Sequence, residues 1–364
     1  MHNQLNNRST NFLLTVKVIR WYIMCNRLHI KVKRVKQLTN IRDVAKEAGV
    51  SVASVSRYLN KKGYISEEAK MKVQSAIELL GYKPNLVARS LSTKQTNLIG
   101  LIVPDITNPF FPELARAVED VALTYGYTVI LCNSDEETEK EIRYIEMLKQ
   151  KYVAGFIVAT NQLQASHYED LDIPIVALDR MIHDSIPTVS SNNIEGARLG
   201  TSYLLECNCQ NIVFMRGPSG LGPADDRLAG FLEAIEGKKI TSHIIECPFN
   251  FEHSERIAKK FLTEIEGIDG IFASTDVSAA GALKAAYSLG ISVPSDLQIV
   301  GFDNISLAGM LTPGLTTVAQ DIYKLGAVAM RMLIKKIEEI ELEDKVIQIP
   351  VELVVRGTTR SEVL

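Results

Sequence analysis

Residues 82–96, YKPNLVARSLSTKQT, separate a short basic segment from a long acidic one and set how the rest of the chain is organised. Gly81 and Pro84 end the helix that precedes this stretch, because glycine favours a helix C-terminus and proline restricts the residue before it. Asn85 can cap a new helix over residues 86–91. A helix of that length is unstable alone in water. We therefore expect a hinge that folds only with a partner.

The charge of the chain divides at the same place. Residues 1–97 contain 18 Lys and Arg against 5 Asp and Glu, whereas the remainder of the 364 residues contains 22 against 38. The net charges of the two parts are therefore +13 and −16. Such asymmetry indicates a head that binds a polyanion and a body that repels the same polyanion.

Residues 1–39 are predicted to be a disordered basic extension, since they contain no Asp or Glu and no sustained hydrophobic period. Two interpretations stay open: a basic arm that touches nucleic acid, or an upstream extension of the reading frame. The apolar runs near Lys17 and Arg20 are too short for a signal peptide or a membrane span. The five cysteines lack CxxC or metal-ligand spacing. These features predict a cytoplasmic protein with no metal site.

Residues 40–83 show the pattern of a helix-turn-helix DNA-binding domain. Gly49 makes a tight turn between the first two helices, and Ser51 and Ser66 are suitable N-caps. The predicted helices begin near residues 41, 52 and 66 and end near residues 48, 59 and 80. The second is the expected recognition helix. Its outward residues, which we expect to contact DNA, are Val52, Ala53, Ser54, Ser56 and Arg57.

Residues 98–364 alternate short apolar strands with amphipathic helices. Strands this apolar are covered on both faces, which predicts an α/β core of two parallel sheets with flanking helices. Ligands bind such sheets at the carboxyl ends of the strands. The predicted strands lie at 98–104, 128–133, 154–160, 173–179, 211–217, 243–247, 270–275 and 297–303, and the predicted helices at 111–125, 138–150, 194–206, 226–236, 254–264 and before 289.

The chemistry-bearing residues favour binding over catalysis. The sequence has no phosphate-binding loop, dinucleotide fingerprint, zinc-protease motif or nucleophile elbow. We therefore predict no enzyme activity and no cofactor. Carboxylates instead follow the predicted strands, at Asp105, Asp179, Asp276 and Asp303. Without a nucleophile or metal ligands, such carboxylates suit the hydroxyl groups of a polyol.

Four motifs together resemble the lactose/galactose-repressor (LacI-type) family of bacterial transcription regulators, over residues 40–364. The resemblance implies a helix-turn-helix head at 40–83, a hinge helix and linker at 84–97, and a two-lobed sugar-sensing core, like the periplasmic sugar-binding proteins, at 98–364. It also implies a homodimer on double-stranded operator DNA; a tetramer stays open. The motifs are NIRDVAKEAGVSVASVSRYLN (40–60), YKPNLVARSL (82–91), LIGLIVPDITNPFF (98–111) and GISVPSDLQIVGFDN (290–304).

Within that family the core is most similar to the branch that regulates ribose operons, through VAGFIVATN (153–161), LDR (178–180), VSSNN (189–193) and RGPSGLGPADDRLAG (216–230). In the hinge the resemblance implies DNA contacts at Asn85 and Leu91, with Leu91 entering the minor groove as a wedge. A further similarity to ribose-binding proteins implies a set of effector contacts. They are Asn108, Phe110, Phe111, Asp179, Arg180, Arg227, Thr275, Asp276, Asp303 and Gln320.

The implied function is a repressor whose operator affinity is controlled by ribose or a related pentose, phosphorylated or not, bound between the core lobes. Whether the sugar induces or corepresses stays open. The alternative within the family is a catabolite-control regulator with a phosphorylated phosphocarrier protein as corepressor. A periplasmic sugar-binding module and a sugar-metabolising enzyme are disfavoured by the basic head and the missing catalytic motifs. Departures from the family pattern at Thr275, Asn192 and ECNCQNI (206–212) bear on which sugar binds.

Overall fold

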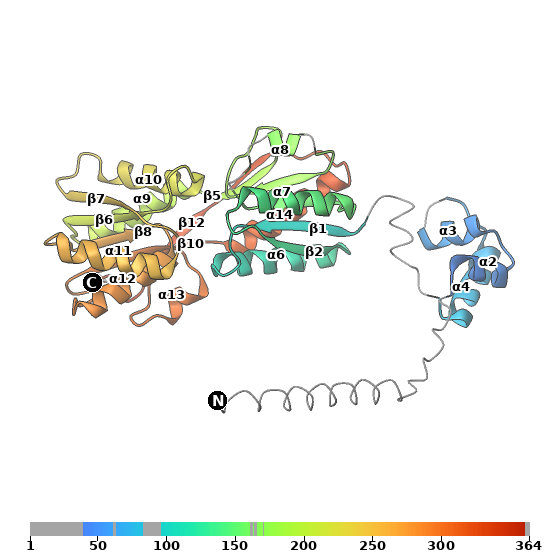
Figure 1. The fold of residues 1–364 in the computed structure, drawn as a ribbon, viewed down its shortest axis with the longest axis horizontal. Helices are drawn as coiled ribbons and strands as arrows, with labels where there is room; N and C mark the ends of the chain where they lie inside the picture. Colours follow the sequence, from blue (N-terminus) through green and yellow to red (C-terminus); the bar gives the residue numbers. More distant parts are fainter. Residues whose placement is uncertain are drawn as a thin grey trace, which may run out of the picture. The chain divides into compact units, whose positions relative to one another are not determined.

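A computed structural model describes residues 39–60, 63–82, 96–160, 163, 166–169 and 171–360 (Figure 1). The chain divides into two compact units, Met1–Ser92 and Thr93–Leu364, and each is described by itself. Residues 1–38 of the predicted extension (1–39) and residues 84–95 of the predicted hinge and linker (84–97), which include Asn85 and Leu91, lie outside the described residues. In the ranges given, no helix has the length and apolar character needed to cross a membrane.

The first unit contains the three helices expected from the sequence, α2 (Ile41–Ala48), α3 (Val52–Asn60) and α4 (Glu67–Leu80). Asn40 caps α2 through a reciprocal pair of hydrogen bonds with Asp43, and Gly49 ends that helix at a φ of 64°. The Ser51 hydroxyl accepts a hydrogen bond from the Ser54 amide at 3.1 Å and so caps α3. Val44, Val55 and Val73 have no exposed surface and form the centre of a small core.

The first lobe of the second unit is built on a six-stranded sheet that is parallel throughout, in the order β11-β5-β4-β3-β1-β2. Helices α6 and α14 pack on one face, whereas α7 packs on the other, which explains why the central strands are buried on both sides. Its elements are β1 (Leu98–Val103), α6 (Phe110–Thr124), β2 (Thr128–Asn133), α7 (Thr138–Gln150), β3 (Gly155–Val158), α8 (Ser166–Glu169), β4 (Ile175–Leu178), β5 (Thr188–Ser191), α14 (Ile322–Ile337) and β11 (Val346–Ile349).

The second lobe has a sheet of the same size, in the order β12-β10-β9-β8-β6-β7. All its neighbouring strands are parallel except β10 and β12. Its elements are α9 (Asn193–Glu206), β6 (Asn211–Arg216), α10 (Gly222–Ile235), β7 (Thr241–Glu246), α11 (Phe251–Glu264), β8 (Gly270–Ala273), α12 (Asp276–Ser288), β9 (Gln298–Asp303), α13 (Ser306–Met310), β10 (Thr316–Gln320) and β12 (Val351–Val354). This two-lobed α/β arrangement confirms the predicted fold class.

The two predicted parallel sheets have one exception, the strand β12, which runs antiparallel to β10. Only Pro350 separates β11 from β12. The chain therefore leaves the first sheet at its carboxyl edge and enters the second sheet from the carboxyl edge as well. A strand that enters from that edge runs against its neighbours.

Two helix starts also differ from the prediction. Helix α10 begins at Gly222, before the expected residue 226, and Pro223 lies in its first turn. Proline suits that position, because the first helical amides have no acceptor within the helix. Helix α11 begins at Phe251, before the expected residue 254, because Asn250 caps it by accepting a hydrogen bond from the His253 amide.

Three crossovers connect the lobes, and each has a single residue between regular elements: Asn192, Asp321 and Pro350. The Asn192 and Asp321 side chains cap the helices that follow them, α9 and α14. The Asn192 amide also donates a 3.0 Å hydrogen bond to the carbonyl oxygen of Ile349 and so ties the first crossover to the third. The lobes are therefore joined by short connections of one residue each, two of which are tied together by a hydrogen bond.

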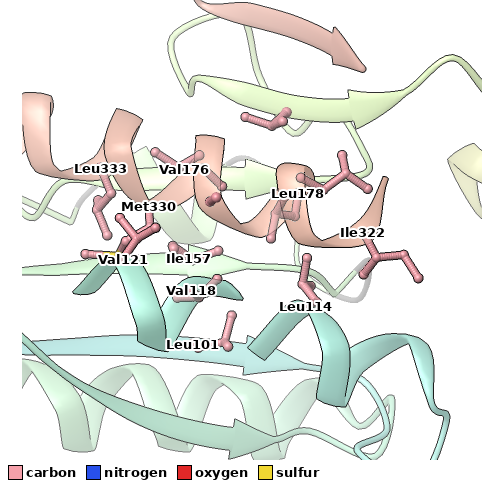
Figure 2. Packing of buried hydrophobic residues seen from close by; sticks show 14 of the residues in the cluster. Leu101, Leu114, Val118, Val121, Ile157, Val176, Leu178, Ile322, Met330 and Leu333 are labelled. Atoms are coloured by element: carbon pink, nitrogen blue, oxygen red, sulfur yellow. The ribbon is translucent and has the colours of Figure 1, made fainter. Parts of the chain in front are cut away.

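Helix α14 seals the first lobe although it follows a strand of the second (Figure 2). Its Met330 and Leu333 pack with Val118 and Val121 of α6 and with Ile157 of β3 (Figure 2). The two helices approach so closely that a Cβ on Gly326 would lie 2.8 Å from the carbonyl oxygen of Leu114. The core of the first lobe is therefore completed by residues from late in the sequence.

Candidate functional site

A cavity of about 400 Å³ lies between the two lobes, a size within the usual range for small-molecule sites. The loops that follow β1, β2, β3 and β4 line it from one side, and those that follow β7 and β8 line it from the other. It therefore occupies the carboxyl edges of both sheets, as the sequence predicted for a ligand site. The polar and aromatic lining residues are Asp105, Asn108, Phe110, Phe111, Asp135, Glu136, Thr160, Asp179, Arg180, Arg227, Phe249, Asn250, Thr275 and Asp303.

The structure brings most of the predicted effector residues to this cavity, namely Asn108, Phe110, Phe111, Asp179, Arg180, Arg227, Thr275 and Asp303. Asp276 and Gln320 are not among its lining residues. The Asp276 carboxylate accepts hydrogen bonds from the Ile305 amide at 2.9 Å and the Thr317 hydroxyl at 2.5 Å. The Gln320 amide donates to the Asp303 carboxylate at 2.6 Å. Gln320 therefore holds the lining residue Asp303 from behind, whereas the Asp276 carboxylate is turned toward residues outside the cavity lining.

Aromatic side chains line the cavity from both lobes. The rings of Phe110 and Phe111 meet edge to face, with centroids 5.2 Å apart. Phe110 also belongs to the hydrophobic core of the first lobe. Phe249, which the sequence reasoning missed, lies in the opposite wall. A Cβ on Gly217 would lie 2.3 Å from its ring, so glycine is required there for the ring to occupy this place.

Arg227 of α10 is the centre of the polar wall and is 3% exposed. Its guanidinium donates to the Asn193 side chain at 2.8 Å and to the carbonyl oxygen of Ser274 at 2.5 Å. It also lies 3.6 Å from the Asp303 carboxylate and 3.8 Å above the ring of Phe302. A planar guanidinium with several fixed partners is well suited to orient hydroxyl groups of a ligand.

The carboxylates of the wall are held in an environment that disfavours their charge. Burial raises the pKa of Asp179 and raises that of Asp303 to about 7, and the charge of Arg227 opposes both shifts. Burial likewise raises the pKa of Asp276, with a further contribution from Asp303. Asp179 and Asp303 also adopt positive φ angles of 61° and 114°. Such backbone strain concentrates at functional sites.

The raised pKa of Asp303 predicts that the ligand-free protein loses stability as the pH rises. An Asp in the unfolded chain has a pKa of ~3.9. Between about pH 4 and the folded value, the folded state therefore holds a proton that the unfolded state has released, and the free energy of unfolding falls with pH. Asp303→Asn removes this proton. We expect its thermal midpoint, measured by scanning calorimetry, to change less between about pH 5 and pH 8 than that of the parent protein.

The exposed Asp172→Asn is the matched control, and its pH dependence should equal that of the parent protein. Parallel curves for the parent protein and Asp303→Asn would contradict the prediction.

In the first unit, α3 presents the predicted DNA-contacting side chains away from the core. Val55 of this helix is fully buried, whereas Val52, Ala53 and Arg57 are exposed and Ser54 and Ser56 are partly exposed. The exposed residues begin at the N-terminal end of the helix, the end with which a recognition helix meets base edges.

Comparisons with known proteins agree with both the helix-turn-helix unit and the two-lobed unit of the chain. Residues 40–85 match the model of bacterial regulatory proteins of the lacI family, and residues 201–359 match that of periplasmic binding protein-like domains. The chain is 56% identical to the ribose operon repressor of Halalkalibacterium halodurans over 323 residues, which are 89% of this chain and 98% of that protein.

Solved structures show the same architecture. A LacI family transcriptional regulator from Enterococcus faecium with bound ribose is 29% identical, with a TM-score of 0.67, over 72% of this chain and 98% of the other. The lac repressor dimer bound to operator and an anti-inducer is 26% identical, with a TM-score of 0.78, over 89% of this chain and 99% of the other.

Proposed function

The chain belongs to the lacI family of bacterial regulatory proteins, and on that premise we propose that it is the repressor of a ribose operon, controlled by the sugar bound between its lobes. The observation that carries the proposal is the cavity at the carboxyl edges of both sheets, with buried Arg227 and Asp303 in one wall and Asp179 and Arg180 in the other. It would act in the cytoplasm as a homodimer on operator DNA.

The lining chemistry fits a pentose. A sugar offers apolar ring faces, against which Phe111 and Phe249 can pack, and a ring of hydroxyl groups that both donate and accept hydrogen bonds. Carboxylates such as Asp179 accept from such hydroxyls, and guanidinium groups donate to them. We propose direct contacts at the predicted residues that line the cavity, and a supporting role for Asp276 and Gln320.

The charge of the cavity favours an unphosphorylated sugar. Its acidic lining residues are Asp105, Asp135, Glu136, Asp179 and Asp303, whereas its only cations among the described residues are Arg180 and Arg227. A phosphate adds up to two negative charges to a site in which carboxylates already outnumber cations. Like charges at close distance in a partly buried site raise the free energy of binding.

Sugar binding can change the affinity for operator DNA by fixing the angle between the two lobes. A ligand that contacts residues of both lobes stabilises one angle, because the crossovers at Asn192, Asp321 and Pro350 are short. The proposed readers of the operator are the exposed residues of α3 in the major groove. Minor-groove contacts by Asn85 and Leu91 of the hinge stay a prediction.

A binding experiment with the full chain tests this function. Operator fragments would be selected from random DNA, and calorimetry would give the dissociation constants of ribose and ribose 5-phosphate. We expect ribose to bind at least about tenfold more tightly than its phosphate, a difference of roughly 1.4 kcal/mol. We also expect ribose to change the affinity for the selected operator.

Tighter binding of ribose 5-phosphate would contradict the charge argument. A protein that selects an operator but binds no pentose would contradict the sugar, and would favour control by a phosphorylated phosphocarrier protein.

A further inference from the structure

A buried carboxylate lies directly behind the first-lobe wall of the cavity. Glu141 in the first turn of α7 has no exposed surface and does not line the cavity. Its Oε1 accepts a hydrogen bond from the Thr160 hydroxyl at 2.7 Å and another from the Tyr168 hydroxyl at 2.5 Å. Thr160 does line the cavity. One carboxylate oxygen thus links α7, α8 and the loop after β3.

This contact decides which hydrogen bond Thr160 can offer a ligand. A hydroxyl group has one hydrogen to donate and two lone pairs. Because Thr160 donates its hydrogen to Glu141, its oxygen remains only as an acceptor. A carboxylate cannot donate, so it enforces this direction, whereas an amide in the same place could donate and allow the Thr160 hydroxyl to turn.

The same carboxylate influences Arg180, a neighbouring cavity residue. Burial lowers the pKa of Arg180, and Tyr168 and Glu141 oppose that shift and so favour the charged guanidinium. The Arg180 guanidinium is also held by a 2.7 Å hydrogen bond that it donates to the carbonyl oxygen of Leu163. Arg180 can only donate. The wall therefore presents an acceptor, Thr160, whose direction depends on Glu141, beside a donor, Arg180.

We propose that Glu141 is a positioning residue for ligand recognition: it fixes Thr160 as an acceptor beside the donor Arg180, so that this wall selects the orientation of a ligand hydroxyl. A hydroxyl placed there would donate to Thr160 and accept from Arg180. The sugar isomer that offers a hydroxyl in that direction is favoured over its epimers. This inference rests on the proposed pentose ligand.

The test compares Glu141→Gln with the parent protein. The substitution keeps the size of the side chain but removes its charge and adds a donor. Calorimetry would give dissociation constants for D-ribose and for its epimers D-arabinose and D-xylose. We expect Glu141→Gln to bind ribose about tenfold more weakly and to lose most of the preference over the epimers, since the wall hydroxyl can then turn.

A double-mutant cycle separates positioning from general stabilisation. Thr160→Val removes the hydroxyl that Glu141 orients. If Glu141 acts through that hydroxyl, the two substitutions together weaken ribose binding less than the product of their separate effects. Glu146→Gln, at an exposed position of the same helix, is the control and should match the parent protein in affinity and in preference.

The results distinguish three cases. The inference is supported by a lower preference among the pentoses together with non-additive losses. It is overturned if Glu141→Gln lowers the thermal midpoint of the ligand-free protein but leaves ribose affinity and epimer preference unchanged. A parent protein that binds none of the three pentoses overturns the proposed function itself, and this inference with it.

Discussion

Replacing Arg227 with methionine should reduce ribose affinity by at least about 100-fold, because the substitution removes the charge around which the polar wall is built. Arg227 is buried and donates to Asn193 and to Ser274. Its charge also opposes the upward pKa shifts of Asp179 and Asp303. Methionine fills similar space but supplies no donor. The neighbouring carboxylates then become harder to ionise and are poorer acceptors for sugar hydroxyls.

Calorimetry with ribose measures the loss, and operator binding without sugar reports whether the head still works. Arg256→Met, at an exposed position of α11, is the matched control and should bind ribose as the parent protein does. A ribose affinity for Arg227→Met within about threefold of the parent value would be incompatible with the central role given to this side chain.

The second large effect is expected on stability, at Gly230. This residue lies on α10 where it crosses α9, and an added Cβ would lie 2.1 Å from the carbonyl oxygen of Ile194. The contact is with backbone, which cannot turn away as a side chain can. The two helices would have to separate. Overpacking of this kind typically costs about 1–3 kcal/mol. Because the clash is with backbone, Gly230→Ala should lower the free energy of unfolding by about 3 kcal/mol or more.

Urea unfolding of the parent protein and Gly230→Ala gives this difference. Gly309→Ala is the control, because a Cβ at Gly309 would meet no atom within 4 Å. Since Arg227 lies one turn before Gly230, separation of the helices should also weaken ribose binding. A variant as stable as the parent protein would show that α9 and α10 can part without cost.

Much of the cavity could be predicted because its residues follow strands. Asp179 and Asp303 come at the ends of apolar runs, and parallel strands bring their carboxyl ends to one edge of a sheet. The same reasoning placed Asp276 in the site, whereas the structure turns it toward Ile305 and Thr317. Its neighbour Thr275 lines the cavity instead. The end of a strand therefore predicts the position of a site residue with an error of about one residue. Which of two neighbouring side chains points into the cavity depends on the cap of the helix that follows.

Some residues belong to the site only through contacts with residues far away in the sequence, and the sequence around them shows no motif. Glu141 reads as one of several acidic residues in the first turn of a helix, and only packing against Thr160 and Tyr168 makes it part of the wall. Phe249 follows a strand in CPFNF, so an aromatic residue at a strand end could have drawn attention. Helix α14 and strands β11 and β12 were not predicted, because chain order does not reveal which lobe a late element joins.

The three crossovers have a consequence for how the protein is made. The first lobe consists of residues 98–191 and 322–349, and the second of residues 193–320 and 351 onward. On the ribosome, strands β1 to β5 of the first sheet emerge long before α14, the helix that covers part of their apolar face. Until the last part of the chain is synthesised, neither lobe can complete its sheet and core. We therefore expect nascent chains that end before α14 to expose apolar strands and to bind chaperones. We also expect residues 98–191 or residues 193–320, expressed alone without the later segment of the same lobe, to aggregate.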